Sequence, residues 1–334
     1  MMDAIESLAA RLAACRKKNE VICLYPHLNL DGDALGSSLA LYLALERLGV
    51  QVVLPLDEPI PTNLDFLPAL DKITKVNGTD GSEACEDHLA LLIDCHEPSR
   101  LGKRQSLCEK SSECWTLDHH IANRPLCSKD VIDPKAAGAA ELIYALIRAL
   151  EHLTGQTLLL RDVAFLLMTA LISDTGGFVY SNTTKRTFAI ASDLMDDDID
   201  LYWIAHRLFY QSTRARLRLM GLVFSQAVFS DDGRIVIGLV SQEMMQASGA
   251  TDEDLEGIIN YLRDVSGVEL AVVLRVQEDG VIRANLRSNS TLDVAQFARQ
   301  FGGGGHPRAA GMTLENISLE EAAALIMKKA GELL

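Results

Sequence analysis

The first half of the chain alternates short apolar runs with stretches in which apolar residues recur at helical spacing. Between Glu20 and about Leu150, the pattern predicts strands at VICLY, QVVLPL, HLALLIDC and CWTLDHH, and helices from about Ala34 to Leu48 and from about Ala136. Strands and helices that alternate in this way are typical of a parallel sheet covered by helices. The fold class that this half predicts is therefore α/β with a parallel sheet.

The second half has a different pattern. From Leu158 to about Leu222 the apolar spacing is mainly helical. Two β-rich segments follow, and each is divided by an Asp-Gly pair, at 232–233 and 279–280, which is a strong hairpin signal. Helix-like segments lie near 252–264 and 319–333. This order of elements predicts a smaller α+β domain.

We therefore predict three parts in the chain. They are a parallel-sheet domain over residues 1–196, a helical connector over 197–215 and a smaller α+β domain over 216–334. We expect a cleft between the two domains, with the connector acting as a hinge.

The chain lacks the sequence features of a secreted or membrane protein. Its first 20 residues have the spacing of an amphipathic helix, with acidic residues before basic ones, which is not the order of a secretion signal. The longest apolar run, around Val163 to Ile172, is shorter than the roughly 18 residues that a membrane span needs. We expect a cytoplasmic protein with no transmembrane helix.

Composition narrows the class further. With 334 residues, 48% of them hydrophobic, the chain can bury cores for two domains. A net charge of −15 disfavours binding of a long nucleic-acid duplex, which requires many Lys and Arg contacts to phosphates, but it allows a short phosphorylated ligand. Seven cysteines without a C-x-x-C pair argue against a disulfide framework or a structural zinc site, and we predict that they are buried and reduced.

A histidine and two aspartates stand where the first predicted strand ends and a helix begins. They are His27, Asp31 and Asp33, in HLNLDGDALG. A loop that turns through Gly32 can aim all three side chains into one crevice. Imidazole and carboxylate groups suit a fairly hard divalent ion such as Mn²⁺. The alternative is that Asp33 only caps the following helix and that His27 lies in the loop by chance.

Three later segments also end in acidic or imidazole side chains. Asp94 follows LALLI, the triplet 118–120 (DHH) ends another strand-like run, and Asp174 ends a long apolar segment. In the triplet, the aspartate can orient a ring while the histidines supply a metal ligand and a proton donor. Each segment alone could be a polar turn. Together they would converge outside the carboxyl ends of the strands, where two divalent ions would balance the charge of four carboxylates. The carboxylates are those of Asp31, Asp33, Asp94 and Asp174.

These motifs resemble the DHH phosphoesterase superfamily. The resemblance rests on HLNLDGDALGS, on Asp94 in LLIDC, on DHH at 118–120 and on SDTG. LRSN at 286–289 and GGGGHPRAAG at 302–311 resemble the DHH-associated domain of the same superfamily, so the likeness spans nearly the whole chain. Within the superfamily the chain is most similar to the NrnA-like branch of nano-RNases, which also act on 3′-phosphoadenosine 5′-phosphate, and RecJ exonucleases are larger relatives.

The resemblance implies a role for each motif residue. It implies two Mn²⁺ ions, of which His27 and Asp31 hold one, while Asp33, His119 and Asp174 hold the other and Asp94 bridges them. His120 would face the scissile phosphate, and Asp118 would orient the histidines.

In the second domain the resemblance implies a phosphate-binding site. It is made by Arg287, Ser288 and His306, with Gly303, Gly304 and Gly305 letting backbone N–H groups approach the ligand. Taken alone, such a glycine run is more often a flexible loop than a binding site.

The chain departs from the family pattern at two places. Leu30 stands where the first motif usually has proline, and GFVYSNTT after SDTG lacks the basic residue that relatives often carry there. Phe178 and Tyr180 in this segment could stack on a base or simply pack in the core.

We therefore predict a two-metal phosphoesterase. Its substrate would be short single-stranded RNA, a linear dinucleotide such as pApA, or 3′-phosphoadenosine 5′-phosphate. The alternatives are an inorganic pyrophosphatase or exopolyphosphatase with the same ligands, and a nucleotide-binding regulator without activity. We expect no membrane partner, and a homodimer is compatible with the sequence.

Overall fold

The computed structural model describes residues 1–76, 88–120, 127, 129–195, 198–277 and 279–334. They form two compact units, Met1–Gln211 and Ser212–Leu334. The predicted boundary between residues 196 and 197 lies outside the described residues. Each unit is described by itself below.

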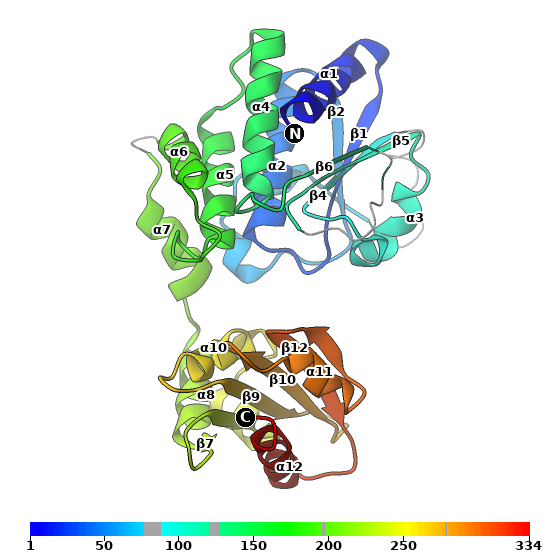
Figure 1. The fold of residues 1–334 in the computed structure, drawn as a ribbon. Coiled ribbons are helices and arrows are strands. Elements are labelled where there is room, and N and C mark those ends of the chain that lie inside the picture. Colours follow the sequence, from blue (N-terminus) through cyan, green and yellow to red (C-terminus); the bar gives the residue numbers. More distant parts are fainter. Residues whose placement is uncertain (77–87, 121–126, 128, 196–197, 278) are drawn as a thin grey trace. The chain divides into compact units, whose positions relative to one another are not determined.

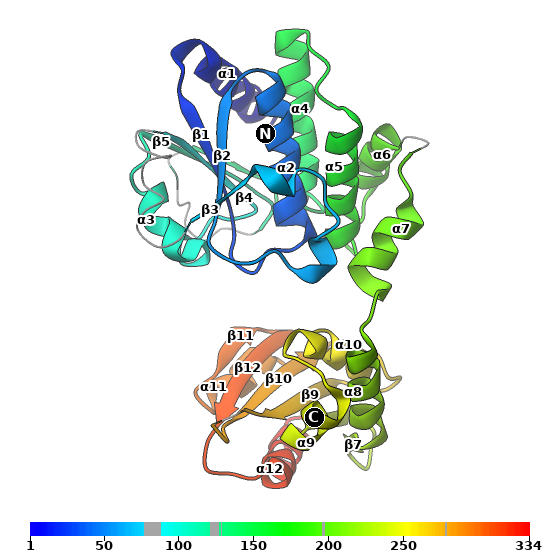
Figure 2. The same cartoon turned by 180° about the vertical axis from the view of Figure 1, so that it is seen from behind.

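The first unit is built on a parallel sheet of six strands, in the order β3-β2-β1-β4-β5-β6 (Figures 1 and 2). The strands are β1 (Val21–Pro26), β2 (Gln51–Leu56), β3 (Ile73–Lys75), β4 (Leu89–Ile93), β5 (Glu113–Asp118) and β6 (Lys129–Ile132). The predicted parallel α/β sheet is confirmed, although β3 and β6 were not among the predicted strands. Because the chain runs outward from β1 to β3 and then returns to β4, the strand order reverses between β1 and β4.

Helices cover both faces of this sheet. Four helices lie on one face: α1 (Met2–Lys18), α2 (Gly32–Arg47), α4 (Ala139–Thr154) and α5 (Arg161–Asp174). On the other face are η4 (Pro98–Arg104) and α3 (Gln105–Cys108). Alternate residues of β1 serve the two faces, because successive strand side chains point to opposite sides: Leu24 packs in the core under α2, and Tyr25 packs under α3.

Helices α2 and α5 approach each other closely at Gly36. A Cβ atom on Gly36 would lie 2.8 Å from the carbonyl oxygen of Leu166, a distance that van der Waals contact forbids. The missing side chain therefore lets the two helices pack backbone to backbone. This packing brings the first turn of α2 beside the last residue of α5, Asp174.

The rest of the first unit is helical, as predicted. It contains α6 (Lys185–Leu194), α7 (Leu201–Ala205) and η5, a π-helical turn at His206–Tyr210. Within the part of the chain that the structure describes, no helix is both long and apolar enough to cross a membrane.

The second unit has a mixed sheet in the order β11-β12-β10-β9-β8-β7 (Figure 2). The strands are β7 (Val228–Phe229), β8 (Ile235–Val240), β9 (Leu270–Val276), β10 (Ile282–Ser288), β11 (Gly304–His306) and β12 (Ala309–Leu314). Both Asp-Gly pairs connect antiparallel neighbours, so the two predicted hairpins are confirmed. Strands β8 and β9 pair in parallel.

Helices also cover both faces of the second sheet. The helices are α8 (Arg214–Ser225), α9 (Gln242–Ser248) and α10 (Ile258–Arg263) on one face, and α11 (Val294–Arg299) and α12 (Leu319–Gly331) on the other. The predicted helix near 252–264 is shorter than expected, because a 3₁₀ turn at Glu253–Leu255 precedes α10. The predicted α+β character of this part of the chain is confirmed.

The prediction that all cysteines are reduced is wrong for one pair. Cys114 and Cys127 form a disulfide, with their Cα atoms 5.3 Å apart. They precede paired segments of the neighbouring strands β5 and β6, and the number of cysteines in a sequence carries no information about such a spatial pairing. Cys15, Cys95 and Cys108 are free and buried, Cys23 is also buried, and Cys85 lies outside the described residues.

Candidate metal centre and active site

Three neighbouring strands end in the predicted site residues. His27 directly follows β1, Asp94 follows β4 and His119 follows β5. Since β1, β4 and β5 are adjacent and parallel, these residues meet at the carboxyl edge of the sheet, where the strand order reverses. Ligand sites of open α/β sheets lie at such a position.

Two helices bring the remaining predicted ligands to the same edge. Asp31 is the N-cap of α2, and Asp33 lies in its first turn. Asp174 is the last residue of α5, which packs against α2. The structure thus brings all six predicted ligands together.

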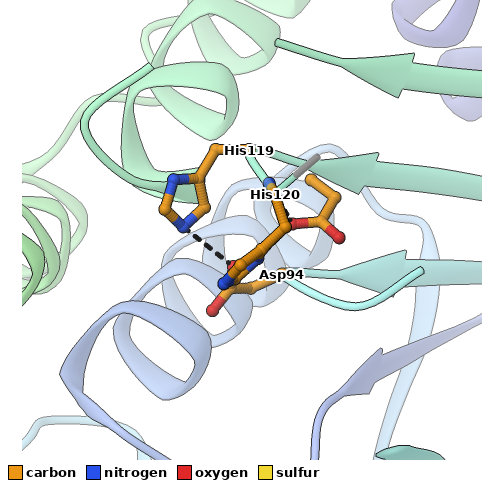
Figure 3. Close-up of side chains that lie close together, drawn as sticks. Asp94, His119 and His120 are labelled. Carbon is orange, nitrogen blue, oxygen red and sulfur yellow. Dashed lines mark hydrogen bonds and ion pairs between the residues drawn. The ribbon is translucent and has the colours of Figure 1, made fainter. Parts of the chain in front are cut away.

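The six side chains form two groups, and Asp94, a member of the first group, also lies next to the second. In each group, the ligand atoms lie within 4.8 Å of one another: His27, Asp31 and Asp94 form one group, and Asp33, His119 and Asp174 form the other. Asp94 Oδ2 is 3.2 Å from His27 Nε2. Asp94 Oδ1 is 3.3 Å from His119 Nε2, and Figure 3 shows Asp94 beside His119 and His120. The two oxygens of one carboxylate therefore face two separate groups of ligands.

Several of these atoms are buried and have no hydrogen-bond partner among the described residues. They are His27 Nε2, His119 Nε2 and Asp94 Oδ1. The other ring nitrogen of His27, Nδ1, donates to the carbonyl oxygen of Leu28 at 2.6 Å, so Nε2 is the nitrogen that faces the carboxylates and can bind a cation. Buried polar atoms are almost always paired, so buried imidazole nitrogens and carboxylate oxygens that converge without a hydrogen-bond partner fit a divalent cation.

The backbone at Asp94 is unusual. Its φ angle is +56°, in the left-handed region, and its side chain is almost fully buried. Its N–H group donates to the carbonyl oxygen of Leu117 in the neighbouring strand. Non-glycine residues adopt this conformation at a free-energy cost, and such residues cluster at functional sites. This backbone conformation therefore marks Asp94, at the edge of the sheet, as a candidate functional residue.

In the absence of cations, protons on the histidines and on Asp33 offset the negative charge of the carboxylates. Burial alone would lower the pKa of His119, but its contacts with Asp174 and Asp94 outweigh burial and raise that pKa to about 11. Contacts with Asp31 and Asp94 likewise outweigh burial and raise the pKa of His27 to about 10. Burial, followed by the charges of Asp174 and Asp94, raises the pKa of Asp33 well above its usual value. Cations bound here would displace these protons.

Helix capping and metal binding are compatible at this site. Asp31, rather than Asp33, caps α2, because its Oδ1 accepts from the N–H group of Ala34 at 2.9 Å. Asp33 instead accepts from the N–H groups of Ala139 and Ala140 at the start of α4. Each carboxylate oxygen has two lone pairs, so both aspartates keep some that are available to a cation.

Asp118 orients His120 and a further histidine that sequence analysis missed. Asp118 Oδ1 accepts from His120 Nδ1 at 2.8 Å and from the His120 backbone N–H group at 3.0 Å. Its Oδ2 accepts a short hydrogen bond from His96 Nδ1, so Asp118 is held from both sides. These bonds outweigh burial and lower the pKa of Asp118. The signal for His96 was its place two residues after Asp94, at the end of a buried strand.

In the second unit, Arg287 lies on β10 and His306 at the exposed end of β11. Among the described residues, no carboxylate forms an ion pair with Arg287, whose Nη1 donates to the carbonyl oxygen of Leu286. Burial and the nearby charge of Arg263 lower the pKa of Arg287. An arginine that is near another arginine and has no carboxylate partner suits an anionic ligand.

Ser288 has a different position from the one that the resemblance implies. It is buried, and its hydroxyl group donates to the carbonyl oxygen of Leu292 at 2.6 Å. This bond uses the hydroxyl within the protein and shapes the loop after β10. Ser288 therefore offers no free hydroxyl to a ligand.

The glycine run is required by strand packing at two of its positions. A Cβ atom on Gly303 would lie 2.3 Å from the carbonyl oxygen of Gly311, and one on Gly305 would lie 2.4 Å from that of Ala309. Gly305 also has a φ of +144°. Gly304 has open space around it. Gly304 and Gly305 thus belong to the edge strand β11, and Gly303 packs directly against β12.

Comparisons with known proteins agree with this arrangement. Residues 21–171 match the DHH family, N-terminal domain, and residues 235–334 match the DHHA1 domain. A protein of Thermus thermophilus, the bifunctional oligoribonuclease and PAP phosphatase NrnA, is 31% identical over 303 residues, which cover 90% of this chain and 86% of that protein. The chain belongs to the DHH family. As a DHH family member it is a hydrolase that acts on phosphoester bonds.

Two solved structures share the fold of this chain. An exopolyphosphatase-related protein from Bacteroides fragilis aligns with a TM-score of 0.87 and 22% identity, covering 99% of this chain and 97% of its own. RecJ from Thermus thermophilus in complex with Mn²⁺ aligns with a TM-score of 0.60 and 16% identity, covering 98% of this chain and 55% of RecJ. The triplet that gives the DHH family its name is Asp118-His119-His120 in this chain.

Proposed function

We propose that this chain hydrolyses short oligoribonucleotides, linear dinucleotides such as pApA and 3′-phosphoadenosine 5′-phosphate, with the help of two divalent ions. The observation that carries the proposal is the position of Asp94, whose two oxygens face two separate groups of histidine and aspartate side chains. The NrnA relative, which is named an oligoribonuclease and PAP phosphatase, supports the choice of substrate.

The ligand set suggests which ions bind. His27 and Asp31 would hold one ion, Asp33, His119 and Asp174 the other, and Asp94 would contact both. Mixed imidazole and carboxylate ligands favour Mn²⁺ among the common divalent ions. Two such ions, when bound, activate a water and neutralise charge on the phosphoryl oxygens.

The protein side chains would then orient the substrate and move a proton. Asp118 fixes the Nδ1–H tautomer of His120, which leaves Nε2 to face the scissile phosphate and to stabilise or protonate the leaving oxygen. His96 keeps Asp118 in place. In the second unit, Arg287 and His306 would bind a phosphate of the substrate, because both side chains offer N–H donors and neither pairs with a carboxylate of the described residues.

The charge of the chain favours small substrates. At −15, the protein gains little from a long polymer, whose binding requires many cationic contacts. A nucleotide with one or two phosphates needs only a few donors, such as Arg287 and His306. We therefore propose short single-stranded RNA and nucleotides, rather than long duplexes, as partners.

A substrate panel tests the proposal. The Mn²⁺-supplemented protein is incubated separately with labelled RNA of two to five nucleotides, with pApA, with 3′-phosphoadenosine 5′-phosphate and with pyrophosphate. We expect hydrolysis of the nucleotide substrates. Turnover of pyrophosphate alone would instead identify a pyrophosphatase, and tight nucleotide binding without turnover would identify a regulator.

Arg287→Gln separates binding from chemistry in the same panel. We expect KM for the nucleotide substrates to rise by roughly tenfold with a smaller change in kcat, because a phosphate contact distant from the reacting atoms acts on binding. Arg283→Gln, at an exposed position on the same strand, is the matched control and should change neither constant. A fall in kcat alone would contradict the binding role of Arg287.

A further inference from the structure

The loop between His27 and Asp31 is held by a glutamate that follows the neighbouring strand β2. Glu58 follows β2, which pairs with β1 in the sheet. Its Oε2 accepts from the N–H group of Asn29 at 3.1 Å, and its Oε1 accepts from the N–H group of Leu30 at 3.2 Å. One carboxylate therefore binds two successive backbone groups between His27 and Asp31.

This contact explains why leucine is compatible with position 30. The family's first motif usually has proline there, and proline restricts the backbone but has no N–H group to donate. Leu30 keeps the N–H group, which binds Glu58, and its side chain is buried in the core of the first unit. A hydrogen bond to a charged acceptor thus replaces a covalent ring as the restraint on this segment.

The segment needs a restraint on physical grounds. Asn29 has a φ of +57°, in the left-handed region, so the backbone turns sharply between the two ligands. On the other side of the turn, the N–H group of Leu28 donates to the carbonyl oxygen of Arg100 at 2.7 Å. The loop is therefore fixed from two sides, and Glu58 supplies the contact nearest to Asp31.

We propose that Glu58 is a positioning residue for the first metal ion: by binding the N–H groups of Asn29 and Leu30, it sets the distance between His27 and Asp31. Glu58 does not itself belong to either ligand group. This inference rests on the proposed two-ion function. It predicts that loss of Glu58 lowers the affinity of the protein for one of the two ions and leaves its affinity for the other unchanged.

Direct measurement of metal binding tests the proposal without relying on activity. Metal-free protein is titrated with Mn²⁺, and the free ion is followed by electron paramagnetic resonance. We expect two bound ions in the unchanged protein. Glu58→Ala should raise Kd for one ion by at least tenfold, about 1.4 kcal/mol, and leave the second within threefold. Thermal unfolding of the metal-free protein should change little.

Conservative variants separate positioning from simple charge attraction. Glu58→Gln keeps one acceptor oxygen, which can accept from one of the two N–H groups, and should raise Kd less than Glu58→Ala does. Glu46→Ala removes a surface carboxylate that pairs with Lys72 and should have no effect. In a Leu30→Pro background, where the second N–H group is absent, Glu58→Ala should cost less than in the unchanged chain.

Each outcome separates this inference from the proposed function. If the unchanged protein binds no Mn²⁺, the two-ion function itself is wrong. If it binds two ions and Glu58→Ala binds them equally well, only the role of Glu58 is wrong. Equal weakening in Glu58→Gln and Glu58→Ala would also overturn it, because it would indicate attraction by charge instead of positioning.

Discussion

The position of Asp94 allows a sharp test of the two-ion centre. Asp94→Asn keeps the size of the side chain and suits the left-handed backbone, because asparagine adopts positive φ more readily than other non-glycine residues. It removes the charge that faces both His27 and His119. We therefore expect the fold to persist while both ions lose a ligand.

The expected magnitudes follow from this geometry. At a Mn²⁺ concentration of about 100 times the Kd of a site, each bound ion stabilises the native protein by about 2.7 kcal/mol. For a unit the size of Met1–Gln211, this corresponds to a rise in Tm of roughly 5–10 °C. Asp94→Asn should abolish this rise and lower kcat/KM by ~1000-fold, equivalent to about 4 kcal/mol.

The assay is differential scanning calorimetry with and without Mn²⁺, together with steady-state hydrolysis of a dinucleotide. Asp94→Ala should lose the same Mn²⁺-dependent rise and, in addition, about 1–2 kcal/mol in the metal-free protein, because alanine resists the left-handed conformation. Asp71→Asn, at an exposed position, is the matched control. An Asp94→Asn protein with the full Mn²⁺-dependent rise in Tm would refute the bridging role.

Three further predictions follow from individual contacts. His96→Asn should lower kcat by roughly 10–100-fold with little change in KM, as measured by dinucleotide hydrolysis, because Asp118 loses one of its two histidine partners. Gly36→Ala should lower the free energy of unfolding by about 1–3 kcal/mol in urea, since the new Cβ would meet the Leu166 carbonyl oxygen; a stabilised variant would mean that helix propensity dominates. The Glu269 carboxylate accepts hydrogen bonds from N–H groups of the loop after β10, and these bonds outweigh burial and lower its pKa from 4.5 to about 2. Its contribution to the free energy of unfolding, on the order of 3 kcal/mol, is therefore complete above pH 4.5 and is lost as the pH falls toward 2. Urea unfolding of Glu269→Gln should accordingly show a flatter pH dependence between pH 5 and 3, and an unchanged slope would contradict the assignment.

The local pattern of the sequence was sufficient to predict the parallel sheet, the hairpins and the residues at the strand ends. Alternation of strands and helices is a short-range property, and so is the change from an apolar run to His27, Asp94 or Asp118. Because parallel strands align their carboxyl ends, the sequence alone also indicated that these residues meet. Short strands such as β3 and β11 escaped prediction, since three residues carry too little periodicity.

The tertiary structure decided the contacts that join residues distant in the sequence. The sequence determined which side chains could bind metal ions, because their chemical type and their place at strand ends are local. Only the fold could decide that Asp33 binds the start of α4, more than 100 positions away, that His96 meets Asp118, and that Glu58 binds the backbone of Leu30. These contacts depend on which strands and helices become neighbours, and that choice is made by packing of the whole core rather than by any local pattern.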